Sequence, residues 1–242
     1  MSAPVFLAED VSGDRVVLTG PEGRHAATVK RLRVGEAVDV VDGRGTRGGC
    51  TVTAVGKDTV ELRVLSRTAE PVPAPRLVLV QALAKGDRGE LAVELATEVG
   101  IDEVVPWSAA RSVVRWDGER GQKALSRWRS TSREAAKQSR RAWVPEVTEA
   151  QSTAQVVELA RTAACTFVLH EEAVAPLAQQ PVPVEGDVLL VVGPEGGITP
   201  EELAAFTAVG AVAVRLGTSV LRTSTAGAAA AAVVSARTAR WR

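Results

Sequence analysis

The sequence predicts an α/β protein in which a small N-terminal β-barrel precedes a larger domain built on a mostly parallel sheet. Short runs of alternating apolar and polar residues, separated by turn residues, fill the first 70 positions. Three prolines then fall within 71–75, and from residue 76 onward apolar strand-like runs alternate with helical patterns. Such alternation is typical of parallel sheets whose two faces are covered by helices.

The barrel strands are expected where β-branched residues alternate with polar ones, at 15–19, 37–42 and 50–55. Glycine and aspartate are frequent at 42–45 and 56–58, and they favour the turns that connect short strands. Repeated short strands at this spacing indicate a small barrel.

One helix is expected inside the barrel, over 22–33, and its sequence gives it a basic face. A basic face on a small barrel suits phosphate contacts outside an active site. The candidate RNA contacts on this helix are Arg24, Lys30, Arg31 and Arg33.

A proline-rich linker marks the expected domain boundary. Positions 71–75 read Pro-Val-Pro-Ala-Pro, which favours a stiff and extended chain. The sequence therefore divides into a barrel over 1–70, the linker, and an α/β domain over 76–242.

The first half of the α/β domain contains two strand patterns and two helix patterns. The apolar run 76–82 predicts a strand, and 88–99 is an amphipathic helix that Gly100 ends. A second strand is expected at 104–107, because it is short, apolar and β-branched. A long basic helix is expected over 118–141.

The second half repeats the alternation. Strands are expected at 166–170, 188–192 and 212–216, and a helix at 200–209, where a proline follows a threonine at the start. The last helix, 225–240, is rich in alanine, and such small side chains permit close packing on a sheet.

Composition limits the classes of protein that remain. No apolar run reaches the length of a bilayer span and no signal-peptide pattern is seen, so we expect a cytoplasmic protein without a membrane partner. Cys50 and Cys165 lie far apart and outside any metal-type cluster. Buried free thiols are therefore expected, and no metal site.

The zero net charge of the chain hides a strongly basic segment. Residues 111–141 carry ten basic and three acidic side chains, a net charge of +7. A solvated helix face and an RNA-binding surface both fit this charge, and Trp116, Trp128 and Trp143 are as compatible with core or dimer contacts as with base stacking. The candidate RNA contacts are Arg111, Arg115, Arg127, Arg133, Lys137 and Arg141.

Two glycine-containing loops predict a small-molecule site. The strand 188–192 runs into Gly-Pro-Glu-Gly-Gly at 193–197, and a second loop over 216–227 follows the next strand. Ligands of open α/β sheets bind at the carboxyl ends of strands, and glycine lets a ligand approach bare backbone. The glycine spacing fits neither the dinucleotide fingerprint nor a P-loop, so a nucleotide-like ligand without a phosphate cradle fits better, with a purely structural turn as the alternative.

Four ordered motifs stand out along the chain. They are 193–198 with Glu201 and Glu202; Leu216, Gly217, 221–223, Thr225 and Ala226; 96–101; and 134–141 leading to Pro145. In these motifs the chain resembles the RsmE family of bacterial 16S rRNA (uracil-N3)-methyltransferases, which belongs to the SPOUT superfamily. One position departs from the family pattern, since Ser224 stands where the family usually has glutamate; we interpret this serine as a helix N-cap.

The resemblance implies a fold and a reaction that composition does not reveal. It implies a deep trefoil knot in the C-terminal domain, a PUA-like barrel, and a homodimer. It also implies transfer of a methyl group from S-adenosyl-L-methionine to N3 of uridine 1498 in 16S rRNA of the small ribosomal subunit. Two alternatives stay open: a SPOUT enzyme with another target, tRNA or a ribose 2′-hydroxyl, and a non-catalytic RNA-binding protein.

Given this reaction, the two glycine-containing loops and the chemistry of methyl transfer to N3 indicate candidate residues for the cofactor and the reaction. Arg222 and Arg140 are expected to stabilise the uracil anion, with Glu134 as a further catalytic candidate, and no general base is identifiable. Glu195 is interpreted as orienting its loop by accepting backbone N–H groups. The expected cofactor contacts are Leu169, His170, Gly193, Pro194, Glu195, Gly196, Gly197, Leu216, Gly217, Val220, Leu221, Arg222 and Thr223.

Overall fold

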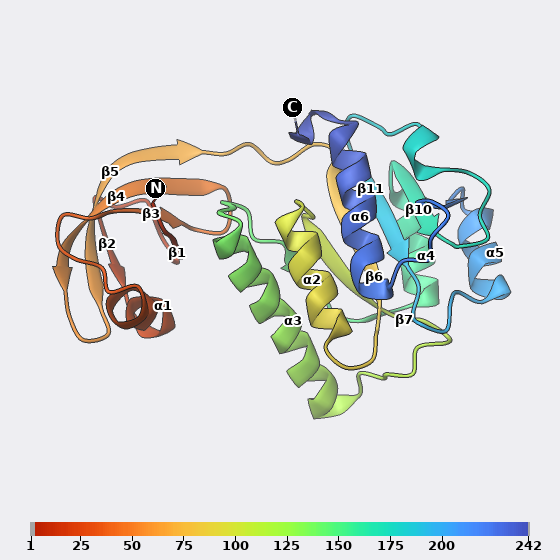
Figure 1. Cartoon of the computed structure of the whole chain (residues 1–242), viewed down its shortest axis with the longest axis horizontal. Helices are drawn as coiled ribbons and strands as arrows, with labels where there is room; N and C mark the ends of the chain where they lie inside the picture. The colour runs from red at the N-terminus through yellow and green to blue at the C-terminus, as the bar shows by residue number, and fades with distance from the viewer. Residues whose placement is uncertain (1–2, 242) are drawn as a thin grey trace. The chain divides into compact units, whose positions relative to one another are not determined.

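The computed structural model describes residues 3–241 and separates into two compact units. The first unit comprises Met1–Val72 together with Ala136–Val144, and the second comprises Pro73–Ala135 together with Pro145–Arg242. Figure 1 shows the elements of both units, coloured by residue number. The first unit is thus discontinuous in sequence, which the linker at 71–75 does not indicate.

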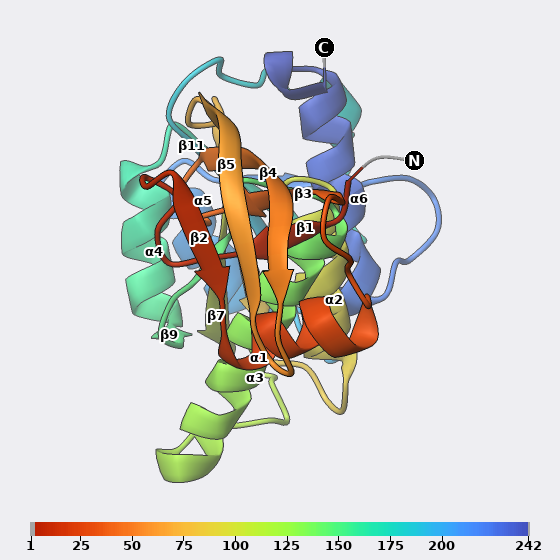
Figure 2. The same ribbon diagram turned by 90° about the vertical axis from the view of Figure 1, so that its left-hand side faces the viewer.

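The first unit is built on a five-stranded sheet with the order β1-β3-β4-β5-β2, seen face-on in Figure 2. β1 pairs with β3 in parallel, and the other neighbours are antiparallel. Alternate side chains of the strands point into one apolar core, for example Val38 and Val40. The predicted small β-domain is therefore present, with β1 and β2 as the edge strands of its sheet. Its strands are Val5–Leu7 (β1), Arg15–Leu18 (β2), Ala37–Val41 (β3), Thr46–Val55 (β4) and Val60–Ala69 (β5).

The helix inside this unit is shorter than the expected 22–33. α1 spans Gly20–Arg24 and continues as one π-helical turn, His25–Val29. The helical chain ends there because Arg31 takes a left-handed backbone conformation, with φ of 54°. Arg31 and Arg33 therefore lie beyond the helix rather than on its face.

The second unit contains a seven-stranded sheet in which every pair is parallel, as predicted. The order is β12-β10-β11-β6-β7-β8, and β9 also pairs with β7. The carboxyl ends of β10, β11 and β12 therefore lie at one edge. The strands are Arg76–Ala82 (β6), Glu103–Ser108 (β7), Glu146–Val147 (β8), Gln151–Ser152 (β9), Cys165–Leu169 (β10), Asp187–Val192 (β11) and Val212–Val214 (β12).

Helices cover both faces of this sheet, as Figure 1 shows. In β6, Leu77 and Leu79 pack in a core with α2, α3 and α6, whereas Val78 and Val80 pack in a second core with α4 and α5. This alternation explains why the strand is apolar at every position. The helices are Arg88–Glu98 (α2), Gly118–Gln138 (α3), Thr153–Thr162 (α4), Pro200–Ala208 (α5) and Thr223–Ala236 (α6).

The extents of α3 and α6 differ from the sequence prediction, and one helix was missed. α3 ends at Gln138 and not at 141, and Arg140 then adopts a left-handed backbone with φ of 59°. α6 begins at Thr223, so Arg222 is its N-cap residue and Ser224, interpreted as the cap, is buried within the first turn. α4 was not expected at all, although Ser152 and Gln155 form a capping box at its start.

The expected close packing of α6 is confirmed at Gly227. A Cβ added there would lie 2.7 Å from Cδ1 of Leu79 in β6, which is closer than real contacts permit. The small residues of α6 therefore let its backbone approach the centre of the sheet.

A buried ion pair fixes the C-terminal end of the second unit. Arg240 lies in a short 3-10 helix, Ala239–Trp241, and its Nη1 donates to Asp102 Oδ2 and to the Pro75 carbonyl, each at 2.7 Å. Its Nη2 donates to the Gly100 carbonyl and to Asp102 Oδ1. The Arg240 and Asp102 side chains are only 6% and 9% exposed.

The cysteines are free thiols, with Cys50 buried and Cys165 half-buried. Burial raises the pKa of the Cys165 thiol to about 11. Within residues 3–241, no three or more His, Cys, Asp and Glu side chains are grouped to hold a metal ion. No helix in that range combines the length and apolarity of a membrane span.

Candidate functional site

A cavity of about 340 Å³ opens at the carboxyl edge of the parallel sheet of the second unit. Its wall includes the last residues of three strands, Leu169 of β10, Val192 of β11 and Val214 of β12. The volume falls within the range of roughly 300–1,000 Å³ typical of small-molecule sites. The position is the one that parallel α/β sheets use for ligands.

The two loops singled out in the sequence form most of this cavity. Every residue predicted to contact the cofactor lines it except Gly196, which faces Arg111 instead. The sequence reasoning missed three charged lining residues, Arg88, Glu171 and Arg215. Glu171 and Arg215 directly adjoin predicted positions, whereas nothing local marks Arg88, which comes from the start of α2.

The glycines of the cavity differ in what constrains them. A Cβ on Gly193 would lie 2.7 Å from Cγ1 of Ile198, so packing within the protein excludes a side chain there. Gly197 has a φ of +75°, a conformation that favours glycine. Gly217 has neither constraint, since an added Cβ would have no atom within 4 Å. The protein itself does not need glycine at 217, and the missing side chain leaves space in the cavity.

A hydrogen-bond relay joins the two loops. The Thr223 hydroxyl donates to the Gly193 carbonyl at 2.8 Å and accepts from Nε2 of Gln81 at 2.9 Å. Gln81 is fully buried near the end of β6. Thr223 thus fixes the start of α6 relative to the end of β11, and the two walls of the cavity are held by one side chain.

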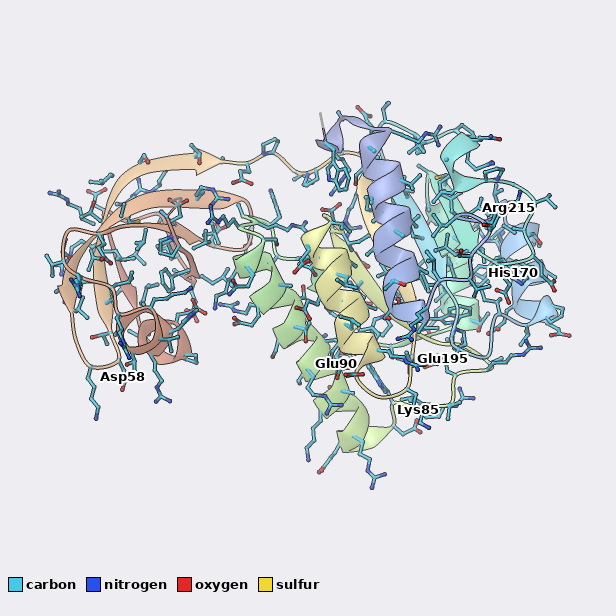
Figure 3. All side chains as sticks on the ribbon, viewed as in Figure 1. Asp58, Lys85, Glu90, His170, Glu195 and Arg215 are labelled. Atoms are coloured by element: carbon cyan, nitrogen blue, oxygen red, sulfur yellow. The ribbon has the colours of Figure 1, made fainter. Side chains whose placement is uncertain are left out.

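Glu195 orients the glycine loop through hydrogen bonds, as the sequence interpretation proposed. Its Oε1 accepts the Lys85 backbone N–H at 3.2 Å and Nη1 of Arg88 at 3.0 Å. Glu195 and Lys85 are labelled in Figure 3. Burial opposes ionisation of this carboxyl, but hydrogen bonds from its own backbone N–H, from Lys85 and from Arg88 outweigh burial and lower its pKa. The carboxylate form therefore ties the loop to the start of α2.

Glu202 connects the helix after the glycine loop to the loop after β7. It is 5% exposed and closes a capping box with Thr199, whose N–H donates to Oε2 at 3.1 Å. Its Oε1 also accepts the Ala110 N–H at 2.8 Å and the Thr153 hydroxyl at 2.9 Å. One buried carboxylate thus satisfies three donors from separate segments.

His170 and Arg215, both labelled in Figure 3, line the cavity. Nδ1 of His170 accepts the Glu172 backbone N–H at 3.3 Å. A neutral imidazole whose Nδ1 accepts carries its proton on Nε2, so the ring offers the cavity a donor.

One of the three catalytic candidates lines the cavity. Arg222 is exposed and lines the cavity, and its guanidinium has no hydrogen bond or ion pair among residues 3–241. Glu134 and Arg140 do not line the cavity. Glu134 is exposed on α3, and Arg140 belongs to the first unit, where its carbonyl accepts from Arg47 Nη2 at 2.8 Å.

Most of the predicted RNA contacts are exposed, but one is not. Lys137 is buried in the first unit, and its ammonium donates to Glu22 Oε1 at 2.6 Å, so it does not offer a phosphate contact. Arg141 is half-buried. The exposed candidates are Arg24, Lys30, Arg31 and Arg33 in the first unit and Arg111, Arg115, Arg127 and Arg133 in the second.

Some of these exposed cations have surface partners. Arg24 pairs with Asp58 at 3.5 Å, and Arg127 pairs with Glu90 at 3.2 Å; both carboxylates are labelled in Figure 3. Such pairs contribute little to stability and exchange readily for a phosphate.

The tryptophans of the basic segment are packing residues. Trp116 and Trp128 meet edge to face with ring centroids 4.9 Å apart, and Trp128 is 2% exposed. In the first unit, Nε1 of Trp143 donates to the Glu70 carbonyl at 3.1 Å. Of the alternatives left open by the sequence, these contacts support the core role.

Known protein families match both parts of the chain. The profile of an RNA methyltransferase domain matches residues 71–235, and that of an RNA methyltransferase PUA domain matches residues 18–65. Two relatives named ribosomal RNA small subunit methyltransferase E are similar along nearly the whole chain. The protein of Mycobacterium bovis is 49% identical, covering 100% of this chain and 94% of its own, and that of Bacillus subtilis is 32% identical, covering 91% and 90%.

Solved structures of methyltransferases are also similar to this chain over nearly its whole length. A ribosomal RNA small subunit methyltransferase E from Neisseria gonorrhoeae, bound to S-adenosyl methionine, has a TM-score of 0.87 at 26% identity and covers 98% of each chain. A putative methyltransferase from Legionella pneumophila, bound to the cofactor SAM, has a TM-score of 0.85 at 28% identity, covering 98% of this chain and 99% of its own. Sequence and structure agree that this chain belongs to the ribosomal RNA small subunit methyltransferase E family.

Proposed function

We propose that the protein is an S-adenosyl-L-methionine-dependent methyltransferase that methylates N3 of uridine 1498 in the 16S rRNA of the small ribosomal subunit. The observation that carries this proposal is the cavity formed by the two glycine loops at the carboxyl edge of the sheet. Its family, and the relatives named for methylation of small-subunit rRNA, supply the substrate class.

The residues of the cavity fit the cofactor. Leu169, Leu216 and Val220 supply apolar surface for an adenine ring, while the open wall at Gly217 admits close approach to the backbone. His170 offers its Nε2–H, and Glu171 an exposed carboxylate, to polar groups of the ligand. S-adenosylmethionine supplies a methyl group already activated by a sulfonium, so the protein must mainly position donor and acceptor.

Replacement of Gly217 by valine is expected to weaken S-adenosylmethionine binding by about tenfold or more, because the new side chain fills ligand space. The free energy of unfolding should change little, since a Cβ there meets no protein atom within 4 Å. Isothermal titration and chemical denaturation measure the two effects. Gly13→Val, at a glycine outside the cavity with only ordinary contacts nearby, is the control. Undiminished cofactor affinity in Gly217→Val would contradict the placement of the ligand.

The proposed chemistry needs an exposed base and a stabilised anion. N3 of uracil carries a proton at neutral pH and lies on the Watson–Crick edge, so the uridine must be unpaired when it reacts. Arg222, on the wall of the cavity, is the residue that we assign to O2 or O4 of the uracil, where negative charge develops as the proton leaves.

Several further properties remain part of this proposal. The exposed cations of both units other than Arg111 are assigned to rRNA phosphates, and the barrel of residues 1–70 is assigned to RNA contacts outside the active site. A homodimer, the deep trefoil knot in the segment 76–242 and a cytoplasmic location follow from the family resemblance and the ribosomal substrate.

Mass mapping of modified nucleosides tests the proposed reaction. The 16S rRNA of cells lacking the gene should lose N3-methyluridine at the target position, and the gene supplied in trans should restore it. Loss of a tRNA methylation or of a ribose 2′-O-methyl group instead would assign the enzyme to another target. Equilibrium titration separates the remaining alternative, because a non-catalytic RNA-binding protein would not bind S-adenosylmethionine.

A further inference from the structure

The Arg111 side chain makes a contact that its predicted RNA role does not use. Arg111 lies in the loop that follows β7, and its Nη1 donates to the Gly196 carbonyl at 3.1 Å. A Cβ added to Gly196 would lie 3.1 Å from the Arg111 Cβ and 3.3 Å from the Arg111 carbonyl. Both the stem and the guanidinium of Arg111 therefore pack on the one predicted loop residue that does not line the cavity.

The backbone that carries Arg111 is itself fixed. The preceding residue, Ala110, donates its N–H to the buried carboxylate of Glu202 at 2.8 Å, and the Ser112 N–H closes a turn on the Ala109 carbonyl at 3.1 Å. Glu202 also caps the helix that follows the glycine loop, through Thr199, so one carboxylate holds the residue before Arg111 and the residue three positions after Gly196.

The glycine loop is thus held at two consecutive residues. Glu195 is bound by Lys85 and Arg88 from the segment after β6, and Gly196 is bound by Arg111 from the segment after β7. Between these attachments and α5, the chain turns at Gly197, whose N–H donates to the Pro194 carbonyl at 2.9 Å. Release of one attachment leaves this turn held from one side only.

We propose that Arg111 is a positioning residue of the cofactor cavity, which holds the glycine loop in its ligand-binding shape, and that this is its main role rather than a phosphate contact. This inference rests on the proposed function, in which the cavity binds S-adenosylmethionine. It separates Arg111 from Arg115, four residues further along, which has no hydrogen bond or ion pair in the described part of the chain.

The test compares Arg111→Ala, Arg111→Lys and the matched control Arg115→Ala in the full-length protein. Three quantities are measured: S-adenosylmethionine affinity, affinity for a 16S rRNA fragment as a function of salt, and hydrogen exchange of residues 193–198 without cofactor. Arg111→Ala should weaken cofactor binding about five- to tenfold and speed exchange in the loop, without changing the salt dependence of RNA binding. Arg111→Lys should restore part of the affinity, and Arg115→Ala should leave cofactor affinity unchanged.

Two results would overturn the inference. One is wild-type cofactor affinity and loop exchange in Arg111→Ala; the other is a loss confined to RNA affinity with a salt slope reduced by about one phosphate contact, which would make Arg111 a phosphate ligand. If the wild-type protein did not bind S-adenosylmethionine, the proposed function would fail. Hydrogen exchange of residues 193–198 in the cofactor-free protein would still test the role of Arg111. Faster exchange in Arg111→Ala would support the positioning role, and unchanged exchange would refute it.

Discussion

Replacement of Arg222 by alanine is expected to slow methyl transfer by about 10²- to 10³-fold, because a preorganised cationic donor stabilises the developing uracil anion. Arg222 lines the cavity, yet its guanidinium has no protein partner within residues 3–241, so its charge is available to a substrate. Its backbone is nevertheless fixed, since its carbonyl accepts the N–H groups of Thr225 and Ala226 at the start of α6. The start of α6 thus fixes the backbone of Arg222, while its guanidinium has no protein partner among residues 3–241.

Single-turnover kinetics with saturating RNA and S-adenosylmethionine measures this effect apart from binding. Arg222→Lys keeps the charge but loses the planar pair of donors, and should recover only part of the rate. Arg140→Ala belongs in the same series, because the sequence assigned the same role to it. Near-normal rates in both alanine variants would rule out anion stabilisation by these arginines.

Arg240→Ala is expected to lower the free energy of unfolding by about 3–5 kcal/mol, since it leaves the buried Asp102 carboxylate without its counter-charge. It also removes donors from the Pro75 and Gly100 carbonyls. Asp102 cannot relax easily, because its Oδ2 also accepts the backbone N–H of Leu77, near the start of β6, at 2.9 Å.

Urea denaturation followed by tryptophan fluorescence measures the loss. Arg161→Ala is the matched control, because Arg161 pairs with Glu158 on the surface of α4 and should cost about 0.5 kcal/mol or less. The double variant Arg240→Ala/Asp102→Asn should be less destabilised than the two single changes added together. A loss in Arg240→Ala as small as that in the control would show that the pair is not a stabilising anchor.

The elements that the sequence predicted well are those encoded by local pattern. The strand 188–192 is apolar at every position because both faces of the sheet are covered, and it leads directly into the glycine loop that forms the cavity wall. The helix ends were predicted poorly, since nothing in the side chains of Arg31 or Arg140 announces a left-handed backbone. The cap role given to Ser224 was wrong because α6 begins at Thr223, two residues before the predicted start, so that Ser224 lies inside the helix.

Local sequence patterns could not predict contacts between segments that lie far apart in the chain. Lys137 looked like one more cation on a basic helix, and only the fold reveals that Glu22, 115 residues earlier, buries its ammonium. The sequence did not predict Arg88 as a cavity residue, because its partner Glu195 lies 107 residues later in the chain. Pairing of this kind depends on topology, which a single sequence does not display.

The discontinuity of the first unit limits how the chain can be divided in evolution or in the laboratory. A gene fragment that encodes residues 1–72 alone would omit Ala142 and Val144, which pack with Val5, Leu7 and Val41. It would also leave the half-buried Glu22 carboxylate without its ammonium partner. Recombination at the linker alone therefore cannot transfer the barrel as a complete folding unit. The segment 136–144 must be transferred together with residues 1–72.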